Sequence, residues 1–376
     1  MTPFSADQAT LRCWAEIDLD ALRRNARICR DLLGQRADLM AIVKADAYGH
    51  GLERVSTALV NEVDWFGVAN VREAIRARKA AASEIPILIL SPATLDEIPQ
   101  IVEGRFSASV STLAEVEAFS LAGEACGVTA LVHAVADTGM GRMGAPPEQF
   151  LELVQAIENA PFCELEGVET HFPSADEDEA FTRQQIGVFE EILKSLALPE
   201  KCRIHLGNSA GLLAFQDHTP FANLARPGIA LYGVSPFEDR DFGLVPALKL
   251  KTRVTLVREI PAGTSISYGR TFISERPMRV ATLGVGYGDG YPRALSGRDA
   301  DVLIRGHRCP VLGRVTMDQI VVDISAIPES PEIGEESVLI GKQGQEEISI
   351  RETAAKAGTI PWEVLTGITS RVERIY

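Results

Sequence analysis

The sequence feature that most constrains the fold is a regular alternation of helix-like and strand-like segments over residues 20–230. Eight short apolar runs fit buried parallel strands, and the segments between them carry apolar residues at helical spacing. The expected strands are residues 39–43, 65–69, 87–90, 106–110, 129–135, 165–170, 203–206 and 224–230. The expected helices are residues 20–33, 72–80, 95–102, 113–122 (with Ser111 as its N-cap), 148–157 and 184–196. This pattern is typical of a (β/α)8 barrel, although an open doubly wound sheet would give the same alternation.

The positions of polar residues distinguish these two folds. Several such residues follow the expected strands directly, and in a barrel the loops after the strands share one mouth. They are Lys44, Arg142, His171, Asn208, Ser209 and Arg226-Pro227-Gly228, after strands one, five, six, seven and eight. The sequence therefore predicts an N-terminal (β/α)8 barrel whose polar residues converge on one site.

Beyond residue 233 the pattern changes to period-two alternation without intervening helices, which indicates an antiparallel β-domain. Its expected strands are residues 253–260, 279–285, 302–304, 313–324, 338–340 and 370–376, with helices at 350–357 and 362–365. We expect a barrel domain at 12–238 and a β-domain at 239–376, with a linker at 238–241. An N-terminal strand at 13–18 is expected to pair with the β-domain.

Composition excludes several classes of function. The formal net charge of −15 argues against non-specific binding to nucleic acid or to an anionic membrane. The six cysteines form no Cys-x-x-Cys pair and the six histidines show no metal-binding spacing, so we expect buried, reduced thiols and no metal. The N-terminus has no signal-sequence pattern and no apolar run is long enough to span a bilayer, so we expect a cytoplasmic protein.

Lys44 is the strongest candidate for chemistry. It stands at the carboxyl end of a continuous apolar strand, in Val43-Lys44-Ala45-Asp46-Ala47-Tyr48-Gly49-His50-Gly51. Desolvation there lowers the pKa of an amine and makes it available for Schiff-base chemistry with a carbonyl. Taken alone, such a lysine more often extends to the rim of a core strand.

Two glycine-containing segments follow the last two expected strands of the barrel. His205-Leu-Gly-Asn-Ser-Ala-Gly and Arg226-Pro-Gly-Ile-Ala-Leu-Tyr-Gly bring backbone N–H groups, a hydroxyl and an arginine to the place where such barrels bind phosphate. We expect a phosphate site there. His171 taken alone fits a satisfied core histidine equally well.

Two segments of the β-domain have simple structural interpretations. Gly284-Val-Gly-Tyr-Gly-Asp-Gly has the wrong spacing for a nucleotide-binding loop, so we interpret it as a bent strand. Tyr268 fits half-buried packing against a sheet. Neither segment suggests a function from its residues alone.

Motifs spread over nearly the whole chain resemble, in order, those of alanine racemases, which are two-domain enzymes that use pyridoxal 5'-phosphate (PLP). They are Ala-Glu-Ile-Asp-Leu at 15–19, the lysine motif at 43–51, Asp-Thr-Gly-Met-Gly-Arg-Met-Gly at 137–144, Thr-His-Phe at 170–172, Asn-Ser-Ala at 208–210, Arg-Pro-Gly-Ile-Ala-Leu-Tyr-Gly at 226–233, Ser-Tyr-Gly at 267–269, Gly-Tyr-Gly-Asp-Gly-Tyr at 286–291 and Gly-Arg-Val-Thr-Met-Asp-Gln at 313–319. So many ordered motifs are a highly specific signal.

The resemblance implies that Lys44 carries PLP as a Schiff base. Arg142 would lie near the ring hydroxyl, His171 near the ring, and His205 would orient Arg226 against the ring nitrogen. An arginine has only donors and stays charged, so that nitrogen would remain unprotonated and the ring a poorer electron sink. The implied cofactor-binding set is Lys44, Tyr48, Arg142, His171, His205, Asn208, Ser209, Arg226, Gly228 and Ile229, of which Tyr48, Ser209, Gly228 and Ile229 would hold the phosphate.

The resemblance also implies a reaction with two bases, because racemisation removes the α-proton on one face and returns it on the other. These bases would be Lys44 and Tyr268 of the partner subunit, in a homodimer with shared sites. Arg142 and the partner subunit's Met317 would hold the substrate carboxylate. The implied activity interconverts L-alanine and D-alanine and supplies D-alanine for peptidoglycan.

Three positions depart from the family pattern. Val135 stands where many members have a lysine, often carbamylated, that orders the arginine matching Arg142. Ser370 replaces a tyrosine that narrows the pocket, and Thr316 replaces a frequent cysteine. Ser370 removes bulk, so a substrate larger than alanine is possible.

Three other functions remain open at this point. A PLP-dependent decarboxylase of basic amino acids shares the two-domain plan, but the context of Cys309 does not match its catalytic-cysteine motif. A PLP homeostasis protein resembles the barrel alone. A lysine, serine or broad-specificity racemase is the third alternative.

Overall fold

The computed structural model describes residues 10–34 and 37–376. The chain divides into two compact units. The barrel unit comprises Leu19–Ala47 and Gly51–Val245, and the β unit comprises the residues up to Asp18, the short segment Tyr48–His50, and Pro246–Tyr376. Residues 238–241, the expected linker, lie within the barrel unit.

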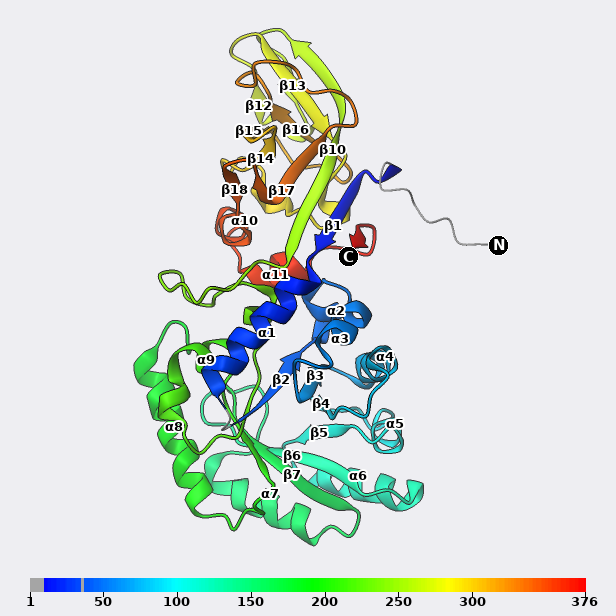
Figure 1. The fold of residues 1–376 in the computed structure, drawn as a ribbon, viewed down its shortest axis with the longest axis vertical. Coiled ribbons are helices and arrows are strands. Elements are labelled where there is room, and N and C mark those ends of the chain that lie inside the picture. Colours follow the sequence, from blue (N-terminus) through cyan, green and yellow to red (C-terminus); the bar gives the residue numbers. More distant parts are fainter. Residues whose placement is uncertain (1–9, 35–36) are drawn as a thin grey trace, which may run out of the picture. The chain divides into compact units, whose positions relative to one another are not determined.

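The barrel unit is built on eight parallel strands in one sheet, in the order β8-β7-β6-β5-β4-β3-β2-β9. Figure 1 labels β2 to β7 of this sheet. The two terminal strands are not paired with each other. Asn223, just before β9, joins them instead: its N–H donates to Ile204 O (3.0 Å), and its Oδ1 accepts from Ile204 N (2.7 Å). The expected barrel is thus confirmed as a near-closed one, and the open doubly wound sheet is excluded.

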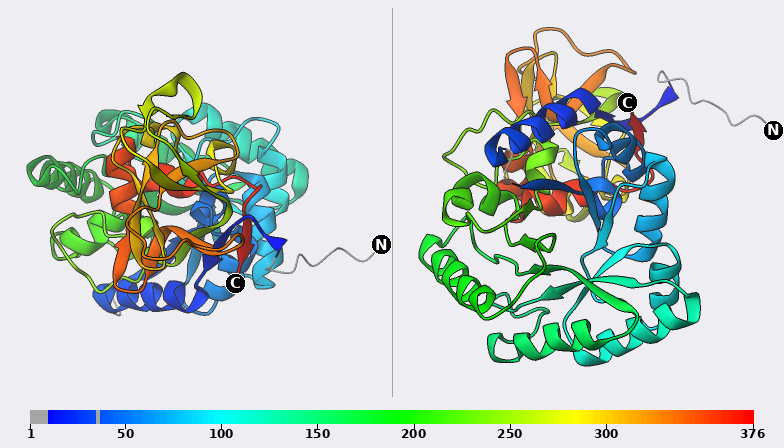
Figure 2. Two further views of the ribbon diagram at one scale, coloured as in Figure 1. Left: turned by 90° about the horizontal axis from the view of Figure 1, so that it is seen from above. Right: turned by 60° about the horizontal axis from the view of Figure 1, so that its bottom comes forward.

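The barrel strands alternate with helices that cover the outside of the sheet (Figure 2). The strands are β2 (Asp38–Ile42), β3 (Trp65–Val68), β4 (Ile87–Ile89), β5 (Ser107–Val110), β6 (Ala130–Val135), β7 (Cys163–Glu169), β8 (Arg203–His205) and β9 (Leu224–Ala225). The helices are α1 (Leu19–Leu33), α3 (Leu52–Leu59), α4 (Val71–Ala81), α5 (Ile98–Glu103), α6 (Leu113–Cys126), α7 (Pro147–Asn159), α8 (Glu179–Lys194) and α9 (Ser209–Phe215). A further short element, α2 (Lys44–Tyr48), joins the barrel unit to the segment Tyr48–His50.

Several barrel elements differ from expectation. The last strand ends at Ala225 rather than residue 230, because Pro227 has no N–H to donate and a 3-10 turn follows at Ile229–Tyr232. Helix α6 is capped by Thr112 rather than Ser111, since Thr112 and Glu115 form a reciprocal capping box. Helices α3 and α9 were not expected, and both are too short to show a clear helical period.

The β unit contains a nine-stranded sheet in the order β18-β17-β14-β15-β16-β13-β10-β1-β19. An additional pairing of β17 with β10 closes six of these strands into a ring. The strands are β1 (Cys13–Ile17), β10 (Leu248–Ile260), β11 (Ser265–Ile266), β12 (Phe272–Ile273), β13 (Met278–Leu283), β14 (Asp301–Ile304), β15 (His307–Leu312), β16 (Ile320–Asp323), β17 (Glu336–Gln343), β18 (Glu346–Ile348) and β19 (Glu373–Ile375), and the helices are α10 (Ile350–Ala357) and α11 (Pro361–Thr366). The N-terminal strand β1 pairs antiparallel with β10, as expected.

The β unit departs from expectation in several strands and in its glycine run. The short strands β11, β12 and β18 were not expected. β15 was not expected, and the expected strand at 313–324 is reduced to β16, because a turn occupies its first half. The glycine run is not a bent strand. β13 ends at Leu283, and Tyr287–Asp289 forms a 3-10 turn between Gly286 and Gly290.

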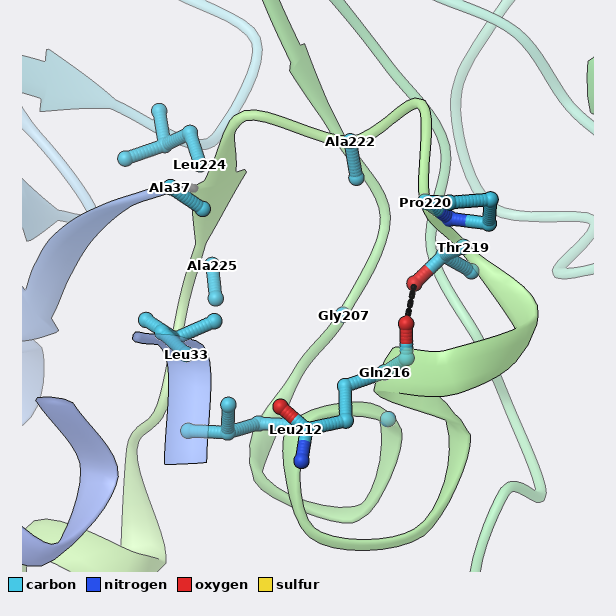
Figure 3. Close-up of a pocket in the computed structure, with 11 residues that line it drawn as sticks. Leu33, Ala37, Gly207, Leu212, Gln216, Thr219, Pro220, Ala222, Leu224 and Ala225 are labelled. Carbon is cyan, nitrogen blue, oxygen red and sulfur yellow. Dashed lines mark hydrogen bonds between the residues drawn. The ribbon is translucent and has the colours of Figure 1, made fainter. Parts of the chain in front are cut away.

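A small cavity lies beside the strand gap of the barrel unit (Figure 3). Its volume is about 30 Å³, close to the space of one water molecule. Gln216 Oε1 is buried nearby without a hydrogen-bond partner among the described residues. The cavity is too small for a substrate or cofactor, and Lys44, Arg142, His171 and Arg226 do not line it. Its lining residues are Leu33, Ala37, Gly207, Gly211, Leu212, Gln216, Thr219, Pro220, Ala222, Leu224 and Ala225.

Among residues 10–34 and 37–376, no helix combines the length and the apolar character needed to cross a membrane. All six cysteines are free thiols. Cys126 is exposed and Cys163 is half-buried, which corrects the expectation that all six are buried.

Candidate active site

Lys44 directly follows the buried strand β2 and the buried residue Val43. Its side chain is half-buried, and burial lowers the pKa of its amine from the usual 10.5. Arg142 and Arg226 lower it further, whereas Glu73 raises it. The environment therefore makes the neutral amine, the form that acts as a nucleophile or base, more accessible than in a solvent-exposed lysine.

The backbone after Lys44 makes a left-handed helical turn. Ala45, Asp46 and Ala47 have φ values of 53°, 54° and 53°. For residues other than glycine, the left-handed conformation costs roughly 1–2 kcal/mol each. Such strain persists only where the surroundings enforce it, and it is concentrated at functional sites.

Arg226 is the buried centre of the barrel site, with only 3% of its surface exposed. One terminal nitrogen, Nη1, contacts Glu169 Oε2 (3.2 Å) and donates to the carbonyl and to the ring Nδ1 of His205. The other, Nη2, donates to Thr170 O (2.6 Å) and to His171 Nδ1 (3.2 Å). These partners compensate the cost of burying the guanidinium, and removing one partner of a buried pair typically costs about 3–5 kcal/mol.

The contact of Arg226 with His205 continues as a chain of hydrogen bonds through the barrel interior. His205 Nε2 lies 2.7 Å from His133 Nδ1, and His133 Nε2 lies 3.1 Å from Glu166 Oε2. An arginine only donates, so His205 Nδ1 must accept and its Nε2 must carry the proton. By the same logic His133 accepts at Nδ1 and donates from Nε2 to the carboxylate. Arg226 at one end of the chain and Glu166 at the other are therefore consistent with one tautomer for each histidine.

His171 is held neutral at the mouth of the barrel. Burial, followed by the charges of Arg226, Arg142 and Lys44, lowers the pKa of His171 to about 3. Because Nδ1 accepts from Arg226, Nε2 carries the proton. His171 thus presents an N–H donor and no positive charge.

Ser209 joins the segments after β8 and β9. Its buried Oγ accepts hydrogen bonds from Gly228 N (2.9 Å) and Ala230 N (3.2 Å), and Ile229 lies between these two residues. Asn208 caps helix α9 by accepting from Gly211 N, and its amide donates to Phe172 O. The expected phosphate residues of the barrel, Ser209, Gly228 and Ile229, are therefore adjacent.

Arg142 is exposed, in the loop after β6. It is close enough to lower the pKa values of Lys44, His171 and Arg226. Val135 is buried at the end of β6 and supplies no charge to anchor Arg142. The structure thus brings Lys44, Arg142, His171, His205 and Arg226 together at the carboxyl ends of the barrel strands.

Tyr48 belongs to the β unit by its contacts, and burial raises the pKa of its phenol to about 12. Its carbonyl accepts from His50 Nδ1 (2.8 Å). Within the β unit, the carbonyls of Gly49 and His50 accept from Arg374 Nε (3.0 Å) and from the hydroxyl of Tyr376 (3.1 Å). The C-terminal strand therefore holds this three-residue segment.

Tyr268 and Met317 lie on turns of the β unit and are 70% and 51% exposed. Tyr268 begins a 3-10 turn, so the expectation of half-buried sheet packing is wrong. Next to Met317, Thr316 Oγ1 donates to Gln319 O (2.7 Å) and closes the turn. A Cβ at Gly286 would lie 2.2 Å from Thr316 O, so glycine is required for this close approach.

Sequence reasoning missed the polar residues inside the barrel. His133 stands within the otherwise apolar strand β6, and Glu166 and Glu169 belong to β7. Ser109 of β5 donates to Glu169 Oε1 (2.5 Å). Polar residues in the middle of buried runs were the available signal, because such groups need partners. Their pairing depends on how strands far apart in sequence are aligned.

Comparisons with known proteins match nearly the whole chain. The chain matches the family model "Alanine racemase, N-terminal domain" over residues 17–236 and "Alanine racemase, C-terminal domain" over residues 247–376. It is 39% identical over 381 residues to the alanine racemase of Halothermothrix orenii, covering 96% of both chains. It resembles the structure of alanine racemase from Streptomyces coelicolor A3(2), with a TM-score of 0.92, 37% identity and 98% coverage of both chains. It also resembles alanine racemase from Bartonella henselae with covalently bound pyridoxal phosphate, with a TM-score of 0.86, 28% identity, and 97% of this chain and 99% of that chain covered.

Proposed function

We infer that this chain, which belongs to the alanine racemase family, interconverts L-alanine and D-alanine, and we propose that Lys44 and Tyr268 of the partner subunit are its two bases. The observation that carries the proposal is the position of Lys44. Its amine has a lowered pKa and stands at the barrel mouth beside Arg142, Arg226 and the neutral His171. Family membership also supports a cytoplasmic role in supplying D-alanine for peptidoglycan.

The residues at the barrel mouth fit PLP as the cofactor. Arg142 and Arg226 both lower the pKa of Lys44, and Arg142 is exposed, so its charge is available to an anionic group. Glu73 and Glu169, which contacts Arg226, oppose part of this positive charge. Ser209 brings a hydroxyl next to the backbone of Gly228 and Ile229, and the N–H of Gly228 donates to that hydroxyl here. We propose that this group of residues, together with the phenol of Tyr48, holds the phosphate. Bound to Lys44, PLP supplies an electron sink that makes the α-proton of an amino acid labile.

The chain's own residues position this chemistry. Arg226 presents donors only, so it favours an unprotonated acceptor as its partner, which limits side reactions at the electron sink. Neutral His171 carries its proton on Nε2, because Nδ1 accepts from Arg226. A hydrogen-bond donor of this kind stabilises the deprotonated form of an acidic group that lies next to it. Arg142 supplies a fixed positive charge for the substrate carboxylate.

The exposure of Tyr268 and Met317 supports a homodimer with shared sites. Main-chain hydrogen bonds hold the turns on which both residues lie, and the two side chains themselves are exposed. Another molecule can therefore contact them. We propose that each β unit supplies Tyr268 as the second base, and Met317 as a substrate contact, to the barrel of its partner. Proton removal on one face and return on the other then involve two different chains.

The alternative functions have less support. Cys309 is fully buried in β15, where it cannot reach a substrate as the cysteine of a decarboxylase would. A PLP homeostasis protein has no counterpart of the β unit. A broader racemase specificity rests on Ser370, which is exposed in the β unit and lacks the bulk of a tyrosine.

The test is to incubate the PLP-loaded protein with L-alanine and follow both enantiomers by chiral chromatography. Equal amounts of D-alanine and L-alanine at the end point, with no conversion by Lys44→Ala, are the expected result. Unchanged L-alanine in the presence of bound PLP would refute alanine as the substrate. L-serine, L-lysine and an assay for released carbon dioxide would then separate the alternatives.

A further inference from the structure

The left-handed turn after Lys44 is held by a carboxylate of the neighbouring helix α4. Glu73 Oε1 accepts from the N–H of Ala45 at 2.8 Å, and Glu73 Oε2 accepts from the N–H of Ala69 at 2.8 Å. Ala45 directly follows Lys44, and Ala69 directly follows β3. One side chain therefore ties together the segments that follow two adjacent strands of the barrel.

Glu73 is itself fixed at the start of its helix. Its N–H donates to Asn70 Oδ1 (3.0 Å), the N-cap of α4. The positive end of the helix dipole favours a carboxylate in this first turn. The backbone of Glu73 is thus fixed at the helix start, and its carboxylate reaches the two N–H groups from there.

A second contact from the same helix restrains the next residue of the turn. Arg76 Nη2 donates to Asp46 Oδ1 (2.9 Å), and the guanidinium also pairs with Glu53 of α3. Asp46 Oδ1 accepts from Leu52 N as well (3.2 Å). Arg76 and Asp46 are almost half exposed, so water competes with this pair and its contribution to holding the turn is small.

We propose that Glu73 is a positioning residue for Lys44, and that it acts by holding the N–H of Ala45 so that the left-handed turn directs the lysine amine into the barrel mouth. Ala45 has no polar side chain to anchor itself, and its conformation is intrinsically unfavourable. Glu73 also opposes the charges of Arg142 and Arg226 at the amine. The inference rests on the proposed role of Lys44.

The test compares three variants of the full-length, PLP-loaded enzyme. Glu73→Ala removes both acceptors. Glu73→Gln retains one carbonyl oxygen and loses the charge. Glu84→Ala is the matched control, because Glu84 pairs with Arg78 of the same helix (3.2 Å) but is 94% exposed. Amide hydrogen exchange of the segment 44–48, followed by mass spectrometry, reports on the turn independently of activity.

The expected result is faster exchange of this segment in Glu73→Ala by about ten-fold or more, the factor that corresponds to losing one hydrogen bond to a charged group. We expect kcat to fall by about 10²-fold, the penalty for misplacing a catalytic group by about 1 Å, with little change in KM. Glu73→Gln should recover part of the loss, and Glu84→Ala should match the wild type in both measurements.

Wild-type exchange and wild-type kcat in Glu73→Ala would overturn the proposal, as would equal losses of kcat in Glu73→Ala and Glu84→Ala. A loss confined to KM would assign Glu73 to substrate binding instead and would also overturn it. Failure of the proposed function gives a different result. In that case the wild type would not racemise alanine, whereas exchange at 44–48 would still respond to Glu73→Ala.

Discussion

The barrel mouth and the exposed turns of the β unit hold their candidate residues in opposite ways. Arg226 is 3% exposed and His205 is fully buried, and both are bonded to further buried groups. Tyr268 and Met317 are 70% and 51% exposed. The side chains of the barrel residues are therefore fixed by hydrogen bonds to other side chains of the same chain. In the β unit only the backbone of Tyr268 and Met317 is fixed by its turn, and the two side chains stay exposed.

The largest expected effect tests whether Tyr268 works on another chain. Tyr268→Phe removes the ionisable hydroxyl, so kcat/KM for L-alanine should fall by about 10²–10⁴-fold, the usual contribution of a general acid or base. Co-expression of Tyr268→Phe with Lys44→Ala should restore activity, because each mixed dimer contains one site with an intact lysine and an intact tyrosine. Activity is measured on mixed dimers separated by affinity tags.

Each variant expressed alone is the control for this experiment. Mixed dimers that form but remain inactive would place both bases on the same chain. The barrel mouth and the exposed turns of the β unit would then differ in the burial of their side chains but not in the chain on which they act.

A smaller effect is expected from the interior of the barrel. Glu166→Ala leaves the N–H of His133 and the hydroxyl of Ser107 without their acceptor. A buried unsatisfied donor costs about 1–3 kcal/mol, so the free energy of unfolding should fall by that amount in urea titrations. Glu164→Ala on the same strand is the matched control, since Glu164 is exposed and 3.9 Å from Lys201. Equal stability of the two variants would show that the histidine chain needs no acceptor.

The smallest effect is a pH dependence of stability in the cofactor-free protein. The folded state holds the pKa of His171 at about 3, below its usual 6.5, so below pH 6.5 the unfolded state binds more protons. Stability should therefore fall as the pH decreases from 6.5 toward 3, by up to about 1.4 kcal/mol per pH unit for this one group. His205 contributes with the same sign, because burial also lowers its pKa.

The measurement is the free energy of unfolding between pH 6.5 and 5 for the wild type and for His171→Asn. The variant should show a shallower slope by about 1 kcal/mol per pH unit, somewhat less than the full linkage value. Identical slopes would mean that His171 is protonated in the folded protein, and its proposed role as a neutral donor would fail.

Much of the barrel was predictable because its information is local. Apolar runs of strand length, separated by helical periods, predicted all eight barrel strands, and polar residues at their carboxyl ends predicted the mouth. Element ends were less predictable. Thr112 rather than Ser111 caps α6 because a hydrogen bond three residues away decides between two suitable residues. The glycine run of the β unit was misinterpreted because its constraint, the carbonyl of Thr316, comes from a different turn.

The sequence by itself determined the order of the barrel strands, the family, and the candidate set around Lys44, because these depend on local period and on ordered motifs. Only the tertiary structure decided how those residues are held. It aligned His133 and Glu166 with His205 across neighbouring strands, and it placed Glu73 against the turn that follows Lys44. Such contacts depend on strand register and on the left-handed backbone after Lys44, which non-local packing imposes against the intrinsic preference of the residues.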